Sequence, residues 1–175
     1  MITDHAATAL RIGHGYDLHR LEPKAPAGPG RELIIGGVRL EHDRGPVAHS
    51  DGDVLYHALV DALMGALAQP DIGQMFPDNA PENAARDSRD FVLEAVRRVH
   101  GAGYLVGNVD ATIILERPRI GPVKDQMRRN MAELLGINVS NINVKGKSHE
   151  RVDAVGEGRA VEAHVVALLG RKRSN

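Results

Sequence analysis

The stretch SDGDVLYHALVDALMGAL, which runs from Ser50 to Leu67, decides the architecture that we predict for this chain. Its apolar side chains recur every three or four residues, which is the spacing of an amphipathic helix. Ser50 is a favourable N-cap residue, and Asp53 follows three positions later, as in a capping box. We therefore expect a helix that begins at Ser50 and turns an apolar face toward a core.

Apolar segments on both sides of this helix predict strands. Four of them are Arg11–Leu18, Leu33–Leu40, Tyr104–Leu115 and Ile142–Ser148. The Gly-Gly pair inside Leu33–Leu40 predicts a bulge or a close approach of another backbone. A fifth segment, Ala160–Leu169, fits strand alternation and helical periodicity equally well, so its pattern alone leaves it undecided.

Two more helices are expected after the first. One is capped by Asp87 or Ser88 and ends near His100, and the other spans Gly121–Leu135 and is followed by Gly. The polar connection Pro70–Ala85 has no periodic pattern, and an unstructured connection of this length is usually functional or mobile.

The length of 175 residues and the absence of a repeat or a linker predict one domain over 11–170. Residues 1–10 are expected to form a flexible lead, and 171–175 a basic tail. The order of elements predicts the α+β class, with a single layer of helices packed on one face of a mixed β-sheet. The opposite face would be bare, and because its burial needs partner subunits we expect an oligomer.

Composition excludes several classes of protein. A formal net charge of -1 argues against binding to nucleic acid, and the lack of Cys excludes disulfides and thiolate metal sites. No apolar run approaches the roughly 20 residues that span a bilayer, so no membrane association is expected. The first ten residues lack the apolar run of a secretory signal, which favours the cytoplasm.

Carboxylates and imidazoles gather on two of the predicted elements. Asp17 and His19 are two apart on a strand and therefore share a face. Asp53, His57 and Asp61 are four apart and share a face of the helix. Two His and one Asp from separate elements suit a zinc ion and leave a fourth position open, as in catalytic sites. The pattern predicts a metal or acid–base site, although each residue taken alone is also compatible with an ordinary hydrogen-bonded polar side chain.

Weaker signals occur elsewhere. The sequences at Asp71–Gly73 and Phe76–Asp78 are compatible with plain turns. Glu116–Arg119 could hold an anion or be a solvated cluster. The sequence Lys145–Ser148 lacks the upstream Gly of a P-loop, so we reject that motif. Its lysines and the nearby Glu150 still provide charges suited to a phosphate and a second metal ion.

Eight motifs taken together carry a resemblance to a known family. They are, in chain order, RIGHGYDLH (Arg11–His19), LIIGGVR (Leu33–Arg39), AHSDGD (Ala48–Asp53), HALVD (His57–Asp61), DIG (Asp71–Gly73), FPD (Phe76–Asp78), DSR (Asp87–Arg89) and GNVDAT (Gly107–Thr112). From about Arg11 to Leu169 the chain resembles the 2-C-methyl-D-erythritol 2,4-cyclodiphosphate synthase family of the non-mevalonate isoprenoid pathway. The resemblance implies a homotrimer with active sites at subunit interfaces, and it makes the undecided last segment a strand.

The resemblance also implies the ligands of two metal ions. Asp17, His19 and His57 match the family's zinc ligands, with one zinc per subunit. Glu150 matches the ligand of a second ion, magnesium or manganese, which bridges the two phosphates of the cytidylyl group.

Catalytic roles at the transition state are implied for His49 and Ser148. Leu115 to Gly121 and the stretch around Lys147 match the nucleotide-binding walls. The residues expected to contact the substrate are Asp17, Leu18, His19, His49, Ser50, Asp71, Ile72, Gly73, Phe76, Pro77, Asp78, Leu115, Arg119, Ile120, Gly121, Gly146, Lys147, Ser148, His149 and Glu150.

The implied activity is that of a phosphorus–oxygen lyase. It converts 4-diphosphocytidyl-2-C-methyl-D-erythritol 2-phosphate to the 2,4-cyclodiphosphate and releases CMP, with the substrate's own 2-phosphate attacking the β-phosphorus. One alternative is a zinc-dependent phosphohydrolase that uses water, with Asp53 or Asp61 as general base. A third is a non-catalytic trimer that binds nucleotide or metal.

Overall fold

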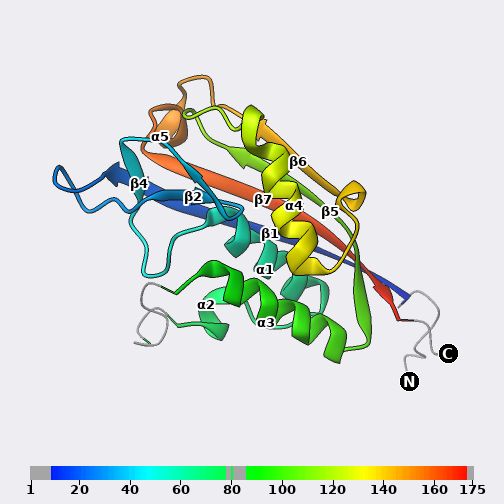
Figure 1. Ribbon diagram of the computed structural model, residues 1–175. Helices are drawn as coiled ribbons and strands as arrows, with labels where there is room; N and C mark the ends of the chain where they lie inside the picture. The colour runs from blue at the N-terminus through cyan, green and yellow to red at the C-terminus, as the bar shows by residue number, and fades with distance from the viewer. Residues whose placement is uncertain (1–8, 78–79, 81–85, 173–175) are drawn as a thin grey trace.

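In the computed structural model, which describes residues 9–77, 80 and 86–172, five strands form one mixed sheet (Figure 1). Their order across the sheet is β4 (Arg44–Pro46), β1 (Leu10–Pro23), β7 (Ala160–Arg171), β5 (Tyr104–Ile114) and β6 (Ile142–Lys147). The pair β5–β6 is parallel, and the other neighbours are antiparallel. The predicted α+β class with a mixed sheet is confirmed.

The central pair of strands settles the segment that the sequence pattern left undecided. Strands β1 and β7 pair without a break from Leu10 opposite Gly170 to Arg20 opposite Ala160. The last segment is therefore a strand, as the family resemblance implied. Strand β1 is also longer than the predicted Arg11–Leu18, because it continues past β7 to pair with β4.

A hairpin replaces the single strand that we expected at Leu33–Leu40. Strands β2 (Leu33–Ile35) and β3 (Val38–Leu40) pair with each other and reverse at Gly36 and Gly37, whose φ angles are 60° and 69°. Two consecutive positive φ angles are the signature of a tight hairpin turn rather than of a bulge. The atoms that come close belong to side chains and not to another backbone, because a Cβ on Gly37 would lie 2.7 Å from the Tyr56 hydroxyl.

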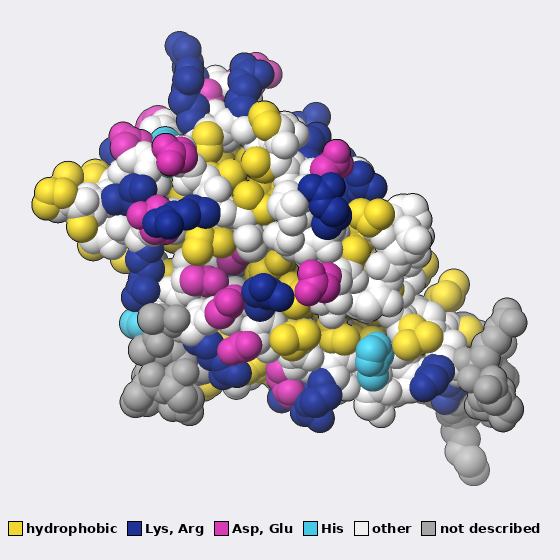
Figure 2. Space-filling view, in the orientation of Figure 1, with side chains coloured by type: hydrophobic (Ala, Val, Ile, Leu, Met, Phe, Trp, Pro, Cys, Tyr) yellow, Lys and Arg dark blue, Asp and Glu magenta, His cyan; other side chains and the backbone are white. Residues whose placement is uncertain are grey.

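The three long helices, α1 (Val54–Ala66), α3 (Ser88–Gly101) and α4 (Lys124–Leu135), lie on one face of the main sheet (Figure 1). The short α2 (Ile72–Met75) packs beside α1, and the short α5 (Asp153–Gly156) comes just before β7. The described chain also contains two 3₁₀ turns, η3 (Gly121–Val123) and η4 (Val139–Asn141). The expected structureless connection thus contains α2. Figure 2 shows charged side chains of both signs spread over the side that carries the helices.

Capping explains where these helices begin and end. The prediction that Ser50 caps the first helix was wrong, because Asp53 is the N-cap and accepts from the Leu55 and Tyr56 N–H groups. Helix α3 begins after its N-cap Asp87, as expected. Helix α4 ends at Gly136, which adopts the left-handed conformation that glycine favours at this position.

Two glycines bring α1 into backbone contact with the sheet. A Cβ on Gly13 would lie 1.8 Å from the Ala62 carbonyl oxygen, and one on Gly15 would lie 1.8 Å from that of Ala58. No side chain other than hydrogen fits at either position, so α1 rests directly on β1. This contact sets the separation between the two elements that carry the candidate ligands.

The sheet face opposite the helices carries several exposed apolar side chains. Alternate residues of β1 point to it, and Ile12 is 71% exposed and Leu18 43% exposed, with Tyr16 between them and Val166 of β7 beside them. His14 of β1 and His164 of β7 lie among them, with their ring centroids 5.4 Å apart. Exposed apolar side chains gathered on one sheet face are typical of a surface that another subunit covers. Among the described residues, none of the helices has the length and apolar character needed to cross a bilayer.

Candidate metal centre

Three side chains from β1 and α1 converge on one point. Asp17 and His19 lie on the face of β1 that α1 covers, and His57 lies in the first turns of α1. His57 Nδ1 is 3.1 Å from Asp17 Oδ2 and 3.2 Å from His19 Nε2, and His19 Nε2 is 3.3 Å from the same carboxylate oxygen. One potential ligand atom from each residue therefore points toward a common centre.

The spacing of these atoms fits a tetrahedral divalent ion. Zinc bonds of about 2.0–2.1 Å place neighbouring ligand atoms of a tetrahedron about 3.3–3.4 Å apart. The three distances, 3.1–3.3 Å, are close to that value. Two imidazoles and a carboxylate are also a typical donor set for zinc, and three protein ligands leave a fourth position for a substrate oxygen.

The electrostatics of the cluster favour an ionised carboxylate. Burial alone would raise the pKa of Asp17, but the hydrogen bond from His57 and the two neighbouring imidazoles lower it below its usual range. Burial lowers the pKa of His19, which keeps its ring neutral near pH 7. Burial would also lower the pKa of His57, yet its hydrogen bond with Asp17 and the nearby carboxylates raise it. A metal ion binds only an unprotonated imidazole nitrogen, so it must displace the proton of His57. We therefore expect metal binding at this site to become tighter as the pH rises.

A cavity of about 270 Å³ opens beside the three side chains. Phe76 and Phe91, whose rings are tilted by 31° with centroids 4.4 Å apart, form one wall. The residues that line it are Asp17, His19, Val47, Ala48, His49, Ser50, His57, Ile72, Gly73, Phe76 and Phe91. The site is thus a small, partly apolar pocket with metal-ligand atoms at its base and the exposed His49 at its rim.

The two other carboxylates on the predicted helix face serve the fold. Asp53 is fully buried, and its carboxylate accepts from the Gly36 and Gly37 N–H groups at 2.9 and 2.7 Å, in addition to capping α1. Asp61 accepts from the Ile72 N–H at 2.8 Å and so holds the start of α2. Of Asp53, His57 and Asp61, which we expected to share a face of the helix, only His57 therefore joins the cluster.

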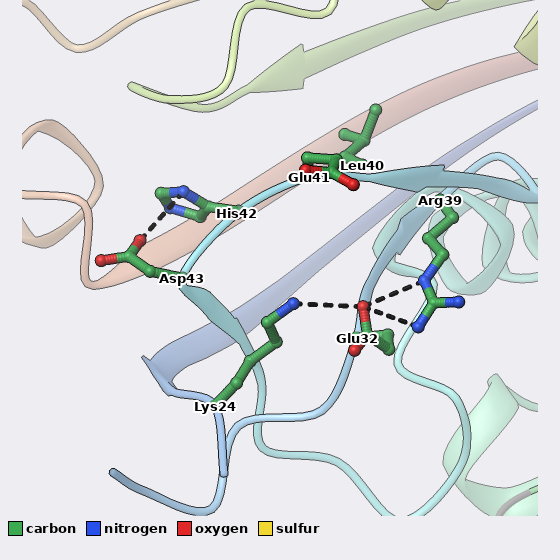
Figure 3. A pocket seen from close by; sticks show the side chains of 7 residues that line it. All are labelled: Lys24, Glu32, Arg39, Leu40, Glu41, His42 and Asp43. Carbon is green, nitrogen blue, oxygen red and sulfur yellow. Dashed lines mark hydrogen bonds and ion pairs between the residues drawn. The ribbon is translucent and has the colours of Figure 1, made fainter. Parts of the chain in front are cut away.

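A second hollow, of about 620 Å³, lies near β3 and β4 (Figure 3). Glu32 pairs with two cations, Lys24 at 3.2 Å and Arg39 at 3.0 Å, and His42 lies 3.1 Å from Asp43. Among the described residues, the hollow holds no converging set of metal-ligand atoms like that of the metal centre.

Comparisons with known proteins agree with this geometry. The model of the YgbB family matches residues 10–170. The chain belongs to the YgbB family. A relative from Oryza sativa, named 2-C-methyl-D-erythritol 2,4-cyclodiphosphate synthase, chloroplastic, is 54% identical over 95% of this chain and 72% of its own. One of the same enzyme name from Rhodopirellula baltica is 49% identical over 98% and 100%.

Solved structures of family members share the fold. IspF of Plasmodium falciparum, solved as a CDP complex, has a TM-score of 0.82 and 35% identity over 95% of this chain and 99% of that chain. The bifunctional IspDF of Campylobacter jejuni has a TM-score of 0.85 and 30% identity over 93% of this chain and 42% of its own. The curated relatives carry the name of a lyase, and the chain is accordingly an enzyme of this class.

The loop that the family resemblance assigned to the substrate lies only partly at the cavity. Ile72, Gly73 and Phe76 line it, whereas the Asp71 carboxylate accepts from the Gln74 N–H as the cap of α2. Pro77 is exposed and does not appear in the lining. Leu18 points to the opposite face of the sheet, and Asp78 lies outside the described residues.

The two predicted nucleotide segments lie together, away from the cavity. Parallel pairing of β5 and β6 places their ends side by side, and the Leu115 N–H donates to the Lys147 carbonyl at 2.9 Å. Gly146 packs on Ile120, because a Cβ there would lie 2.8 Å from its side chain. Within the described part of the chain, no residue of 115–121 or 146–150 lines the 270 Å³ cavity. Ser148 and Glu150 are exposed, and His149 lies 2.8 Å from Asp153.

Sequence reasoning missed two residues behind the metal centre. Ser88 lies within hydrogen-bond distance of His57, and Asp51 bonds to Ser88, although neither was assigned a role at the site. Ser88 is the middle residue of the family motif Asp87–Arg89, which is the signal that could have pointed to it.

Proposed function

We propose that the chain converts 4-diphosphocytidyl-2-C-methyl-D-erythritol 2-phosphate to 2-C-methyl-D-erythritol 2,4-cyclodiphosphate and releases CMP. The observation that carries this proposal is the convergence of Asp17, His19 and His57 at the base of a cavity with His49 and Ser50 on its wall. The names of the relatives in the same family support it.

In this reaction the protein must position the substrate and stabilise charge, and it need not supply a nucleophile. An oxygen of the substrate's 2-phosphate forms the new bond to the β-phosphorus, and the bond from that phosphorus to the CMP oxygen breaks. The chain must hold two anionic groups in line against their repulsion. A zinc ion at Asp17, His19 and His57 and a magnesium or manganese ion at Glu150 would supply the positive charge that this reaction needs.

Polar side chains complete the proposed site. Ser50 is buried at the cavity wall, where its hydroxyl is suited to a phosphate oxygen, and His49 is exposed at the rim, within reach of the erythritol part. His49 and Ser148 would stabilise the charge that develops at the phosphorus under attack. The other proposed contacts are those that the family resemblance implies, including Asp71 to Gly73 and the nucleotide segments.

We propose a homotrimer in which each site takes its nucleotide segment from a neighbouring subunit. Two observations support this assembly. The apolar face that includes Ile12 and Leu18 is exposed in the single chain. The segments 115–121 and 146–150 do not line the cavity of their own described chain, so a second chain can supply them. We also propose one domain over 11–170 and a cytoplasmic location, which cell fractionation with an antibody to the chain tests.

Tracing oxygen separates cyclisation from hydrolysis. The purified protein is incubated with the cytidylyl substrate, zinc and magnesium in ¹⁸O-labelled water, and the products are analysed by ³¹P NMR and mass spectrometry. We expect CMP and a cyclic diphosphate without ¹⁸O, because the attacking oxygen comes from the substrate. A linear product that contains one ¹⁸O atom would instead identify a phosphohydrolase. The structure gives that alternative little support, since Asp53 is sealed in the core and Asp61 is bonded to the Ile72 N–H.

A further inference from the structure

The two ring nitrogens of His57 face different surroundings. Nδ1 points to Asp17 and His19, as described above. Nε2 points away from them, to the hydroxyl of Ser88 at 2.9 Å and to that of Ser50 at 3.2 Å. Ser88 is the first residue of α3 and is completely buried, so its hydroxyl has no access to bulk water. The ring is therefore held between a candidate metal position and a buried hydroxyl.

Ser88 is in turn held by Asp51. The Ser88 hydroxyl donates a short hydrogen bond to Asp51 Oδ1, and the Ser88 backbone N–H donates to Asp51 Oδ2 at 3.1 Å. A carboxylate only accepts hydrogen bonds, and a serine hydroxyl has a single proton. That proton is committed to Asp51, so Ser88 offers His57 only the lone pairs of its oxygen.

This chain of contacts favours the tautomer of His57 that can bind a metal ion. Both ring nitrogens face an acceptor, because Asp17 Oδ2 lies 3.1 Å from Nδ1 and the Ser88 oxygen lies 2.9 Å from Nε2. A metal ion at the triad takes the Nδ1 lone pair, so the neutral ring that binds it carries its proton on Nε2, where the Ser88 oxygen accepts it. Nδ1 is the atom that lies beside Asp17 and His19. The hydrogen bonds thus prepare the nitrogen that a metal ion would bind.

We propose that Asp51 and Ser88 are positioning residues that fix His57 as the Nε2-protonated tautomer and thereby set the metal affinity of the site. A hydrogen-bonded partner on the far nitrogen of a ligand His fixes its tautomer and orientation. Here the partner is a serine whose direction is set by a carboxylate from the loop before α1. The inference rests on metal binding by the triad, which belongs to the proposed function, and not on the cyclisation itself.

Two variants test the relay in different ways. Ser88→Ala removes the acceptor, and loss of such a partner typically weakens metal affinity by about 10- to 100-fold. Asp51→Asn places an amide donor near the serine oxygen, which allows the Ser88 proton to turn toward His57 and favours the opposite tautomer. We expect Asp51→Asn to weaken zinc binding at least as much as Ser88→Ala. The exposed Ser140, in η4, provides a matched Ser→Ala control that should leave zinc affinity unchanged.

The measurements are zinc dissociation constants by competition with a chromophoric chelator and the ring ¹⁵N shifts of the zinc-loaded protein. Thermal unfolding of each metal-free variant shows that it is folded. We expect the wild-type His57 ring to show a protonated Nε2, and Asp51→Asn to lose or shift that signal. If Ser88→Ala does not fold, Asp51→Asn carries the test alone.

Three results would overturn parts of this account, and they are distinguishable. Unchanged zinc affinity and ring shifts in both variants would refute the relay while leaving the metal site intact. A loss of affinity in Ser50→Ala but not in Ser88→Ala would assign the acceptor to Ser50 instead. A wild-type protein that binds no divalent ion would refute the metal site, and with it the proposed function.

Discussion

Replacing Gly15 by Ala should separate α1 from β1 and open the metal centre. The new Cβ would lie 1.8 Å from the Ala58 carbonyl oxygen and 2.6 Å from the Ala62 nitrogen, both of which are backbone atoms that no rotamer change can move. Cβ atoms essentially never approach another atom closer than 3.0 Å, so the helix must move away by at least 1.2 Å, the difference between 3.0 and 1.8 Å.

That displacement exceeds what the ligand geometry tolerates. Metal–ligand distances must stay within about 0.2 Å of their usual values, so a shift of His57 by this amount breaks the three-residue set. Forcing an extra carbon into a packed interior also costs about 1–3 kcal/mol of the free energy of unfolding. We expect Gly15→Ala to lose zinc and to unfold at a lower urea concentration.

Zinc content by mass spectrometry and urea unfolding monitored by circular dichroism measure both effects. Gly65→Ala is the matched control, because Gly65 lies in α1, on the other side of the same contact, and its Cβ would meet only the His14 carbonyl oxygen, at 3.7 Å. That variant should keep its zinc and gain up to about 1 kcal/mol from the better helix propensity of Ala. A Gly15→Ala protein with full zinc and the unfolding midpoint of the control would refute the reasoning.

Four further predictions concern the ligands and the exposed face. His57→Ala should lose zinc and activity together while the oligomer persists, and full zinc by metal analysis in that variant would reject the ligand assignment. Glu150→Gln should weaken the dependence of activity on magnesium or manganese but retain zinc, and an unchanged titration with those ions would count against its role. The folded metal-free protein holds the pKa of Asp17 below its unfolded value. The ionised group therefore stabilises the fold above about pH 4, and this contribution is lost as the pH falls through the lowered pKa. Asp17→Asn should reduce the loss of urea stability on acidification, and an identical pH dependence of the urea midpoint would contradict the shift. Ile12→Asp should reduce the mass measured by light scattering to that of a single chain, whereas Leu93→Asp, at an exposed apolar position of α3, should not. Equal masses in all three proteins would exclude the face of Ile12 as the interface.

The spacing of apolar residues predicted helices and strands well where one side of the element is buried and the other is exposed. The apolar spacing of 54–67 predicted α1 because that helix packs on the sheet with one side. Capping was harder to predict, because Ser50 and Asp53 are both good N-caps and only the hairpin above the helix decides between them. The turn at Gly36 and Gly37 was taken for a bulge or a close backbone approach within one strand, since the letters alone do not show that the segments on either side pair with each other.

The candidate site was predictable in part for a similar reason. The two-residue period of a strand placed Asp17 and His19 on one face without any knowledge of the fold. The spacing of Asp53, His57 and Asp61 could not show which of them joins that pair, because the answer depends on where α1 starts. Ser88 was missed because its contact with His57 bridges 31 residues and a polar connection without a periodic pattern.

The bare contact between β1 and α1 has a practical consequence for engineering this enzyme. The distance between the two elements is fixed by main-chain atoms at Gly13 and Gly15, and not by the bulk of any side chain. Buried apolar side chains such as Leu63 or Met131 can therefore be exchanged for others of similar volume to raise heat resistance. We expect these exchanges to leave the positions of the ion-binding atoms unchanged. Any library meant to improve robustness should leave the two glycines fixed and vary the interior around them.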